Sequence, residues 1–225
     1  MSNDRADRTV AWVGPFAFFM VLLVLMPRLP IAQPWESIVR VVLITASLWF
    51  WSRDVLRTLR VHHALASTAV GVLVFGVWVA PDLLVSGWRD HWLLQNAVTG
   101  ELRTTIPAEA FADPLVTTLR FARAALLVPI LEELFWRGWL PRWMANPAWR
   151  TVPLGHYSRV AFVGTAVLFA AEHGPYWDVG LVAGVLYNVW MWRTKSLGDL
   201  ILAHAVTNAC LSAFVLWSGR YEYWM

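Results

Sequence analysis

The sequence predicts an all-α fold, a polytopic bundle of transmembrane helices that forms a single domain over residues 1–225. Hydrophobic residues make up 58% of the chain and charged residues only 15%, whereas soluble domains average about 45–50% and about 25%. The mean hydropathy is +0.52, and the apolar residues gather in runs close to the roughly 20 residues that span a bilayer. The chain also carries 16 tryptophans, a residue that concentrates at membrane–water interfaces.

Three apolar runs occupy the N-terminal part of the chain. We interpret the first as a retained span, because the charges before it cancel and no clean small-x-small cleavage site follows Met26. A cleaved signal peptide ending near Ala32 is the alternative. The predicted spans are Val10–Met26, Ile38–Trp51 (starting at Trp35 if Glu36 and Arg40 extend toward the interface) and Ala64–Leu84.

A polar connection and four further apolar runs make up the rest of the chain. The connection covers 85–114 and is predicted to include an interfacial helix near Trp88–Leu94. Residues 10–114 thus hold the N-terminal spans and the polar loop, and 115–217 form a core that carries the sequence motifs. The predicted spans of this core bring the total to about seven: Leu115–Leu140, Val160–His173, Trp177–Trp192 and Leu197–Trp217.

The distribution of basic residues predicts the orientation. Loops on the cytoplasmic side of a membrane are enriched in Lys and Arg. The loop after the second span, the segment after the fourth and the turn after the sixth hold most of the loop basic residues, so we expect a cytoplasmic N-terminus in the inner (cell) membrane. The net charge is only +3 and the basic residues are scattered, so no nucleic-acid partner is expected.

The fourth span contains ionisable residues that lipid disfavours. An ionised side chain at mid-membrane costs about 2.5–3.5 kcal/mol on insertion scales, so such residues face a protein interior or a wet cavity. Glu133 and Arg137 are spaced i, i+4 and can pair on one helix face, while Glu132 points about 100° away. The competing interpretation places 131–140 at the cytoplasmic interface, where the three side chains would be solvated.

Further polar residues lie at helical spacing in the later spans. His173 ends the fifth span, and His204 and Asn208 are spaced i, i+4 within the seventh. Each alone is typical of a hydrogen bond between membrane helices. Together with the two glutamates they indicate a functional cavity between the fourth, fifth and seventh helices.

Three motifs in this order resemble a known family. Residues 132–137 fit EExxxR, residues 169–173 fit FxxxH, and residues 204–208 fit HxxxN. The ordered trio on hydrophobic helices resembles the CPBP family of intramembrane glutamic endopeptidases, which includes the type II CAAX prenyl proteases and bacteriocin self-immunity proteins. The resemblance covers roughly 115–216.

The resemblance implies a role for each motif residue in peptide hydrolysis. Glu132 would be the general base that activates a water, and His173 would hold that water. The oxyanion would be stabilised by His204 and Asn208. A second layer formed by Glu133 and Arg137 would orient these catalytic residues. The resemblance implies a metal-free site without a cofactor. It does not carry over the family's substrate, so we expect only a peptide or protein substrate, a class that includes membrane-anchored and lipidated chains.

Other interpretations of the same residues remain open. Glu132, His173 and His204 are plausible zinc ligands, although HExxH is absent and Asn is a poor zinc ligand. A non-catalytic membrane immunity or binding protein would use the same scaffold. A proton-coupled transporter would also bury Glu and His, but the internal repeats expected of one are not found. The single cysteine, Cys210, lies in an apolar run and is interpreted as a packing residue.

Overall fold

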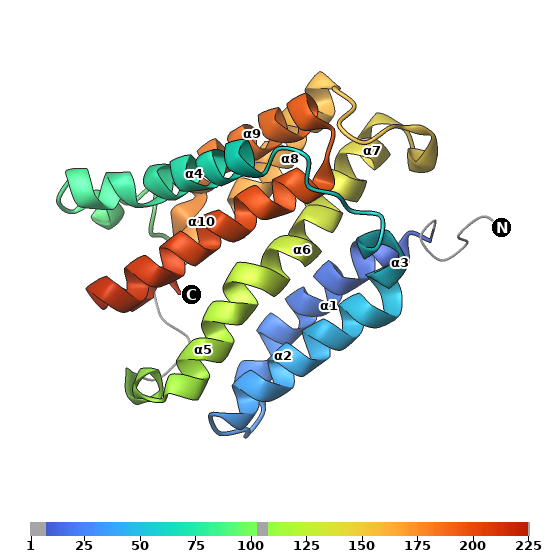
Figure 1. The fold of residues 1–225 in the computed structure, drawn as a ribbon. Helices are drawn as coiled ribbons and strands as arrows, with labels where there is room; N and C mark the ends of the chain where they lie inside the picture. The colour runs from blue at the N-terminus through green and yellow to red at the C-terminus, as the bar shows by residue number, and fades with distance from the viewer. Residues whose placement is uncertain (1–7, 103–107, 225) are drawn as a thin grey trace.

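The computed structural model describes residues 8–102 and 108–224 and confirms an all-helical bundle (Figure 1). No β-strand occurs in those two ranges. The helices run along a common direction, and the long helix that contains α5 and α6 lies between α10 and the pair α1 and α2 (Figure 1).

The N-terminal helices pair with each other and against the motif-bearing core. Helix α1 spans Val10–Leu25, and α2 (Trp35–Ser47) continues through the π-helical segment Leu48–Ser52 into α3 (Arg53–Leu56). The Ser52 hydroxyl donates a 2.6 Å hydrogen bond to the Ala11 carbonyl, which joins α1 to the end of α2. On its other side α1 stacks Phe16 on Phe135, with ring centroids 4.3 Å apart. The first spans therefore form one wall of the core.

The fourth predicted span is a longer and less regular helix than the sequence indicated. It runs continuously over Pro114–Ala145, beyond the predicted end at Leu140. It begins with Pro114 behind Asp113, whose carboxylate accepts the Leu115 N–H at 2.8 Å. Its regular parts are α5 (Pro114–Ala122), α6 (Val128–Glu133) and α7 (Leu140–Ala145), and the π-helical segments Arg123–Leu127 and Leu134–Trp139 separate them.

These π-helical segments matter for the site. Each shifts the rotational register of the side chains that follow, and such insertions are frequent at functional sites. They flank α6 on both sides, so the two glutamates of the EExxxR motif lie at the end of a short regular segment between two irregular ones.

The remaining helices pack closely through small residues. Helix α4 spans Ala64–Leu84 and lies against α10 (Leu197–Ser218). A Cβ at Gly71 would collide with the Ala203 carbonyl oxygen and lie 2.7 Å from the Val206 Cβ. Helix α8 (Arg159–Glu172) pairs with α9 (Trp177–Thr194) after the short turn at residues 173–176.

Four helices in the described ranges are long and apolar enough to cross a membrane, namely Val10–Arg28, Ala64–Leu84, Pro114–Ala145 and Leu197–Ser218. The second, fifth and sixth predicted spans are present as helices, but they are shorter or carry more polar residues. The number of crossings therefore stays a prediction.

The prediction of an interfacial helix near Trp88–Leu94 is wrong. This segment forms a single 3-10 turn at Trp88–Asp90. Its residues are engaged in tertiary contacts instead. Arg89 pairs with Asp82 at 2.7 Å and with Asp178 at 2.6 Å, so this segment is held against the ends of α4 and α9. A regular helix would have to give up these buried ion pairs.

Candidate active site

A cavity of about 420 Å³ lies inside the bundle. All four side chains that the resemblance identifies as catalytic line it: Glu132, His173, His204 and Asn208. These residues come from the fourth, fifth and seventh predicted helices, as expected. The walls, however, also include Phe19 from α1, Arg40 from α2, Trp78 from α4 and Tyr187 from α9. Helices α1, α2, α4 and α9, beyond those that carry the motifs, thus help to enclose the site.

Glu132 has one carboxylate oxygen without a partner. The side chain is buried, and its Oε2 forms no hydrogen bond. This oxygen lies 4.0 Å from Nε2 of His204. A water about 2.8 Å from both atoms would fit this separation as a bridge. The gap beside the Glu132 carboxylate therefore has room for a water.

Glu133 is fully engaged, in contrast to its neighbour. Its carboxylate accepts from Arg137 Nη1 at 3.0 and 3.2 Å and from Nδ1 of His204 at 2.7 Å. Because both Glu133 oxygens already accept from Arg137, the Glu133 carboxylate is also the acceptor in this bond, and the proton is assigned to Nδ1 of His204. The ring nitrogen toward Glu132 is then Nε2, which accepts when the ring is neutral and donates when it is an imidazolium.

Arg137 is held from several sides. Its Nε donates to the Asn188 side-chain oxygen at 3.1 Å, and its guanidinium lies 4.3 Å from the ring centroid of Phe169. Glu132, Glu133 and Arg137 are 6%, 0% and 1% exposed. The interpretation that placed them at a solvated interface is therefore wrong, because the surrounding helices enclose all three.

The FxxxH spacing has a local structural reason. Nδ1 of His173 donates a 2.6 Å hydrogen bond to the Phe169 carbonyl, one helical turn earlier. A carbonyl oxygen can only accept, so the proton is on Nδ1 and Nε2 carries a lone pair. The ring also contacts the Trp78 ring, with centroids 5.1 Å apart. His173 is thus fixed in a tautomer that can accept a hydrogen bond from water.

Asn208 is anchored through one of its two amide hydrogens. Its Nδ2 donates to the Ala124 carbonyl at 2.9 Å, in the π-helical segment at the start of the EExxxR helix. The second amide hydrogen remains for a ligand. Beside it, Thr207 accepts from the Tyr187 hydroxyl at 2.8 Å and bonds the Gly71 carbonyl at 2.8 Å. These contacts hold α10 against both α9 and α4.

One comparison with known proteins gives a match. Residues 114–210 match the protein-family model described as type II CAAX prenyl endopeptidase Rce1-like. This core is similar to the Rce1-like family. The match begins at α5 and ends within α10, so it contains all six predicted site residues, and it supports an intramembrane protease of the CAAX type. It confirms the resemblance seen in the three motifs. No curated protein and no solved structure matches the chain.

One carboxylate of the site was missed by the sequence reasoning. Glu172 lines the cavity, and its Oε2 accepts from the Trp136 indole N–H at 3.0 Å. It lies close enough to Glu132 to repel it electrostatically. The signal was present, because a glutamate in an apolar helix is unusual. It was overlooked because it occupies a variable position of FxxxH.

Metal binding at this site would need at least three suitable side chains in one place. Within the two described ranges, no three His, Cys, Asp or Glu side chains are grouped in a way that could hold a metal ion. The nearest partners of the two histidines are a carbonyl and a carboxylate, each on Nδ1. Chelation tests the zinc alternative directly.

Proposed function

We propose that this protein is an intramembrane endopeptidase that hydrolyses a peptide bond with a water activated by Glu132. The observation that supports this most directly is that the unpartnered Glu132 oxygen shares a cavity with His173, His204 and Asn208. A buried carboxylate without a hydrogen bond is unfavourable for stability alone. The presence of this carboxylate is understandable if a water and a substrate supply the missing hydrogen bond.

In this mechanism Glu132 takes a proton from the water while His173 accepts a second hydrogen bond through Nε2. The resulting hydroxide attacks the carbonyl carbon of the scissile bond. Glu132 then transfers the proton to the leaving nitrogen, so the carboxylate acts first as base and then as acid. General acid–base catalysis of this kind contributes about 10²–10⁴-fold to the rate.

The negative charge that develops on the carbonyl oxygen would be stabilised by His204 and Asn208. Asn208 has a free amide hydrogen, and His204, whose Nδ1 is bonded to Glu133, lines the same cavity. In a low-dielectric cavity each such donor is worth about 2.7–4 kcal/mol. Arg137 holds the Glu133 carboxylate in place and so positions His204 indirectly.

The substrate class that we propose is a peptide or protein, including chains anchored in the membrane or carrying a lipid. The family match describes prenyl endopeptidases, and the cavity combines polar catalytic groups with apolar and aromatic walls. Such a cavity suits an extended chain whose apolar part stays in contact with lipid.

The experiment is cleavage of fluorogenic peptides by the purified full-length protein in detergent. Glu132→Gln keeps the shape of the side chain and removes its basicity, so kcat should fall by about 10²–10⁴-fold. The matched control is Glu222→Gln, since Glu222 lies half-buried in an ion pair with Arg220 at 2.8 Å, outside the cavity lining. The control should cleave at the wild-type rate.

Unchanged cleavage in Glu132→Gln would remove the proposed mechanism. Loss of activity in a chelator, restored by zinc, would replace it with a metal-dependent one. Specific binding of peptides without cleavage by the wild type would assign the scaffold to a binding or immunity protein.

A further inference from the structure

The cavity has a second charged end that the proposed mechanism does not use. Three arginines line it in addition to the catalytic residues: Arg40 from α2, Arg120 from α5 and Arg123 from the π-helical segment Arg123–Leu127. The cavity is therefore bipolar, with the Glu132 and Glu172 carboxylates in one part and guanidinium groups in another.

Two of these arginines already have partners. Arg40 is held by Glu36, with Nε to Oε1 at 2.7 Å, one helical turn earlier. Arg120 donates to the Trp224 carbonyl, and its guanidinium lies 5.4 Å from the Trp224 ring centroid. These contacts fix both side chains along the cavity wall.

Arg123 differs from its two neighbours. It makes no hydrogen bond or ion pair with any residue of the described ranges, although it lines the cavity. Arg40 and Arg120 also repel it electrostatically, whereas Glu36, which is paired with Arg40, attracts it without forming an ion pair with it. A guanidinium inside a membrane helix that is left without an anion is costly, and such residues mark ligand sites by default. The group that would relieve this cost carries a negative charge.

We propose that Arg123, flanked by Arg40 and Arg120, binds an oxyanion group of a ligand in this cavity. The planar guanidinium fork matches carboxylate and phosphate oxygens, which it holds with two parallel hydrogen bonds. Two sources share this chemistry, the C-terminal carboxylate of a substrate peptide and the phosphate of a lipid headgroup. The first source rests on the proposed peptidase function, whereas the second does not.

The spacing along the helix fits a peptide ligand. Arg123 precedes Glu132 by nine residues, which is about 13 Å at 1.5 Å per residue. An extended peptide covers that distance in about four residues at 3.3 Å each. A carboxylate bound by Arg123 would thus leave a peptide bond within reach of Glu132, and the anion would set which bond is cleaved.

The test measures binding rather than turnover. Hexapeptides without Asp or Glu are prepared as free acids and as C-terminal amides, and their retention on the full-length Glu132→Gln protein is measured. The free acids should be retained about tenfold more strongly or better, as expected for a charge-assisted hydrogen bond. Adding Arg123→Met should abolish that preference, while Arg123→Lys should keep part of it. The matched control is Arg57→Met, since Arg57 is an exposed arginine outside the cavity.

A lipid arm separates the two sources. Phosphatidylglycerol and phosphatidylcholine are added to the same proteins in neutral detergent, and the unfolding temperature is measured. The site binds a lipid phosphate if phosphatidylglycerol raises the unfolding temperature of the protein, if Arg123→Met removes this increase, and if free-acid peptides are not preferred over amides.

If wild-type Arg123 and Arg123→Met behave alike toward both probes, the proposal is wrong. Arg123→Lys, which retains the charge, shows whether a loss in Arg123→Met reflects misfolding. Binding is measured on the Glu132→Gln protein and therefore does not depend on turnover. If that protein prefers free-acid peptides but the wild type cleaves no peptide, the peptidase function is wrong and the anion site is retained.

Discussion

Two adjacent glutamates of this chain have opposite environments, and the difference defines the site. Glu133 accepts three hydrogen bonds from Arg137 and His204, whereas Oε2 of Glu132 accepts none. The i, i+4 spacing predicted the pairing of Glu133 with Arg137. It did not predict the bond to His204, which lies 71 residues later, because helix packing alone brings the two together.

Glu133→Gln is expected to destabilise the protein, because it leaves Arg137 buried without a carboxylate. Breaking a buried ion pair from one side costs about 3–5 kcal/mol. The measurement is equilibrium unfolding in detergent. In Glu222→Gln, where the pair is about one-third exposed, the loss should be at most about 1 kcal/mol. Equal losses in the two variants would contradict the description of Glu133 as the buried anchor.

At the scale of elements, the contact between α4 and α10 positions the HxxxN motif. Gly71 allows the two backbones to approach, and its carbonyl accepts from Thr207, which neighbours Asn208. Close approach through small residues is a general way in which membrane helices associate. A side chain at this position would move α10 and with it His204.

Gly71→Leu should therefore destabilise the protein by about 1–3 kcal/mol through overpacking, and the displacement of α10 should lower cleavage activity. Gly76→Leu is the matched control on the same helix, since a Cβ there meets nothing within 4 Å. It should be neutral or slightly stabilising, because leucine favours helix more than glycine does. Thermal unfolding and peptide cleavage measure both effects. An intact Gly71→Leu protein with full activity would show that the close contact is dispensable.

The apolar runs predicted the helices well but not their internal structure. The fourth helix extends to Ala145 and contains two π-helical segments, which no hydropathy pattern encodes because each adds a residue to one turn without changing composition. The prediction of an interfacial helix near Trp88–Leu94 was wrong for a related reason. Ion pairs from Arg89 to Asp82 and Asp178 hold this segment, and Asp178 lies 89 residues away in the sequence.

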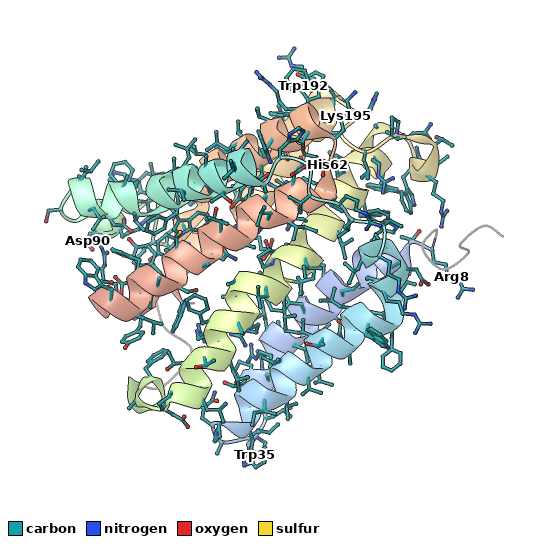
Figure 2. All side chains as sticks on the ribbon, viewed as in Figure 1. Arg8, Trp35, His62, Asp90, Trp192 and Lys195 are labelled. Carbon is teal, nitrogen blue, oxygen red and sulfur yellow. The ribbon has the colours of Figure 1, made fainter. Side chains whose placement is uncertain are left out.

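At the scale of the whole molecule, the helices alternate in direction. Figure 2 labels Arg8, His62 and Lys195 toward one end of the bundle and Trp35 and Asp90 toward the other. This arrangement agrees with the alternation of basic loops from which a cytoplasmic N-terminus was predicted.

Alkaline phosphatase fusions test that orientation. A fusion after Ala32 should be active, because the loop after the first helix is predicted to face away from the cytoplasm. A fusion after His62 should be inactive, since the preceding loop carries the basic residues Arg57 and Arg60. The opposite pattern would invert the topology, although it would leave the cavity unchanged.

The sequence by itself determined the helical membrane class, the approximate helices and the six motif residues, because hydropathy and i, i+4 spacing are local properties. Only the tertiary structure decided that the first three predicted spans help to enclose the site, that Glu172 joins it and that Arg123 faces the same cavity without an anion. The physical reason is that these relations join helices far apart in the chain. Packing between helix faces sets them, and no local pattern records which faces meet.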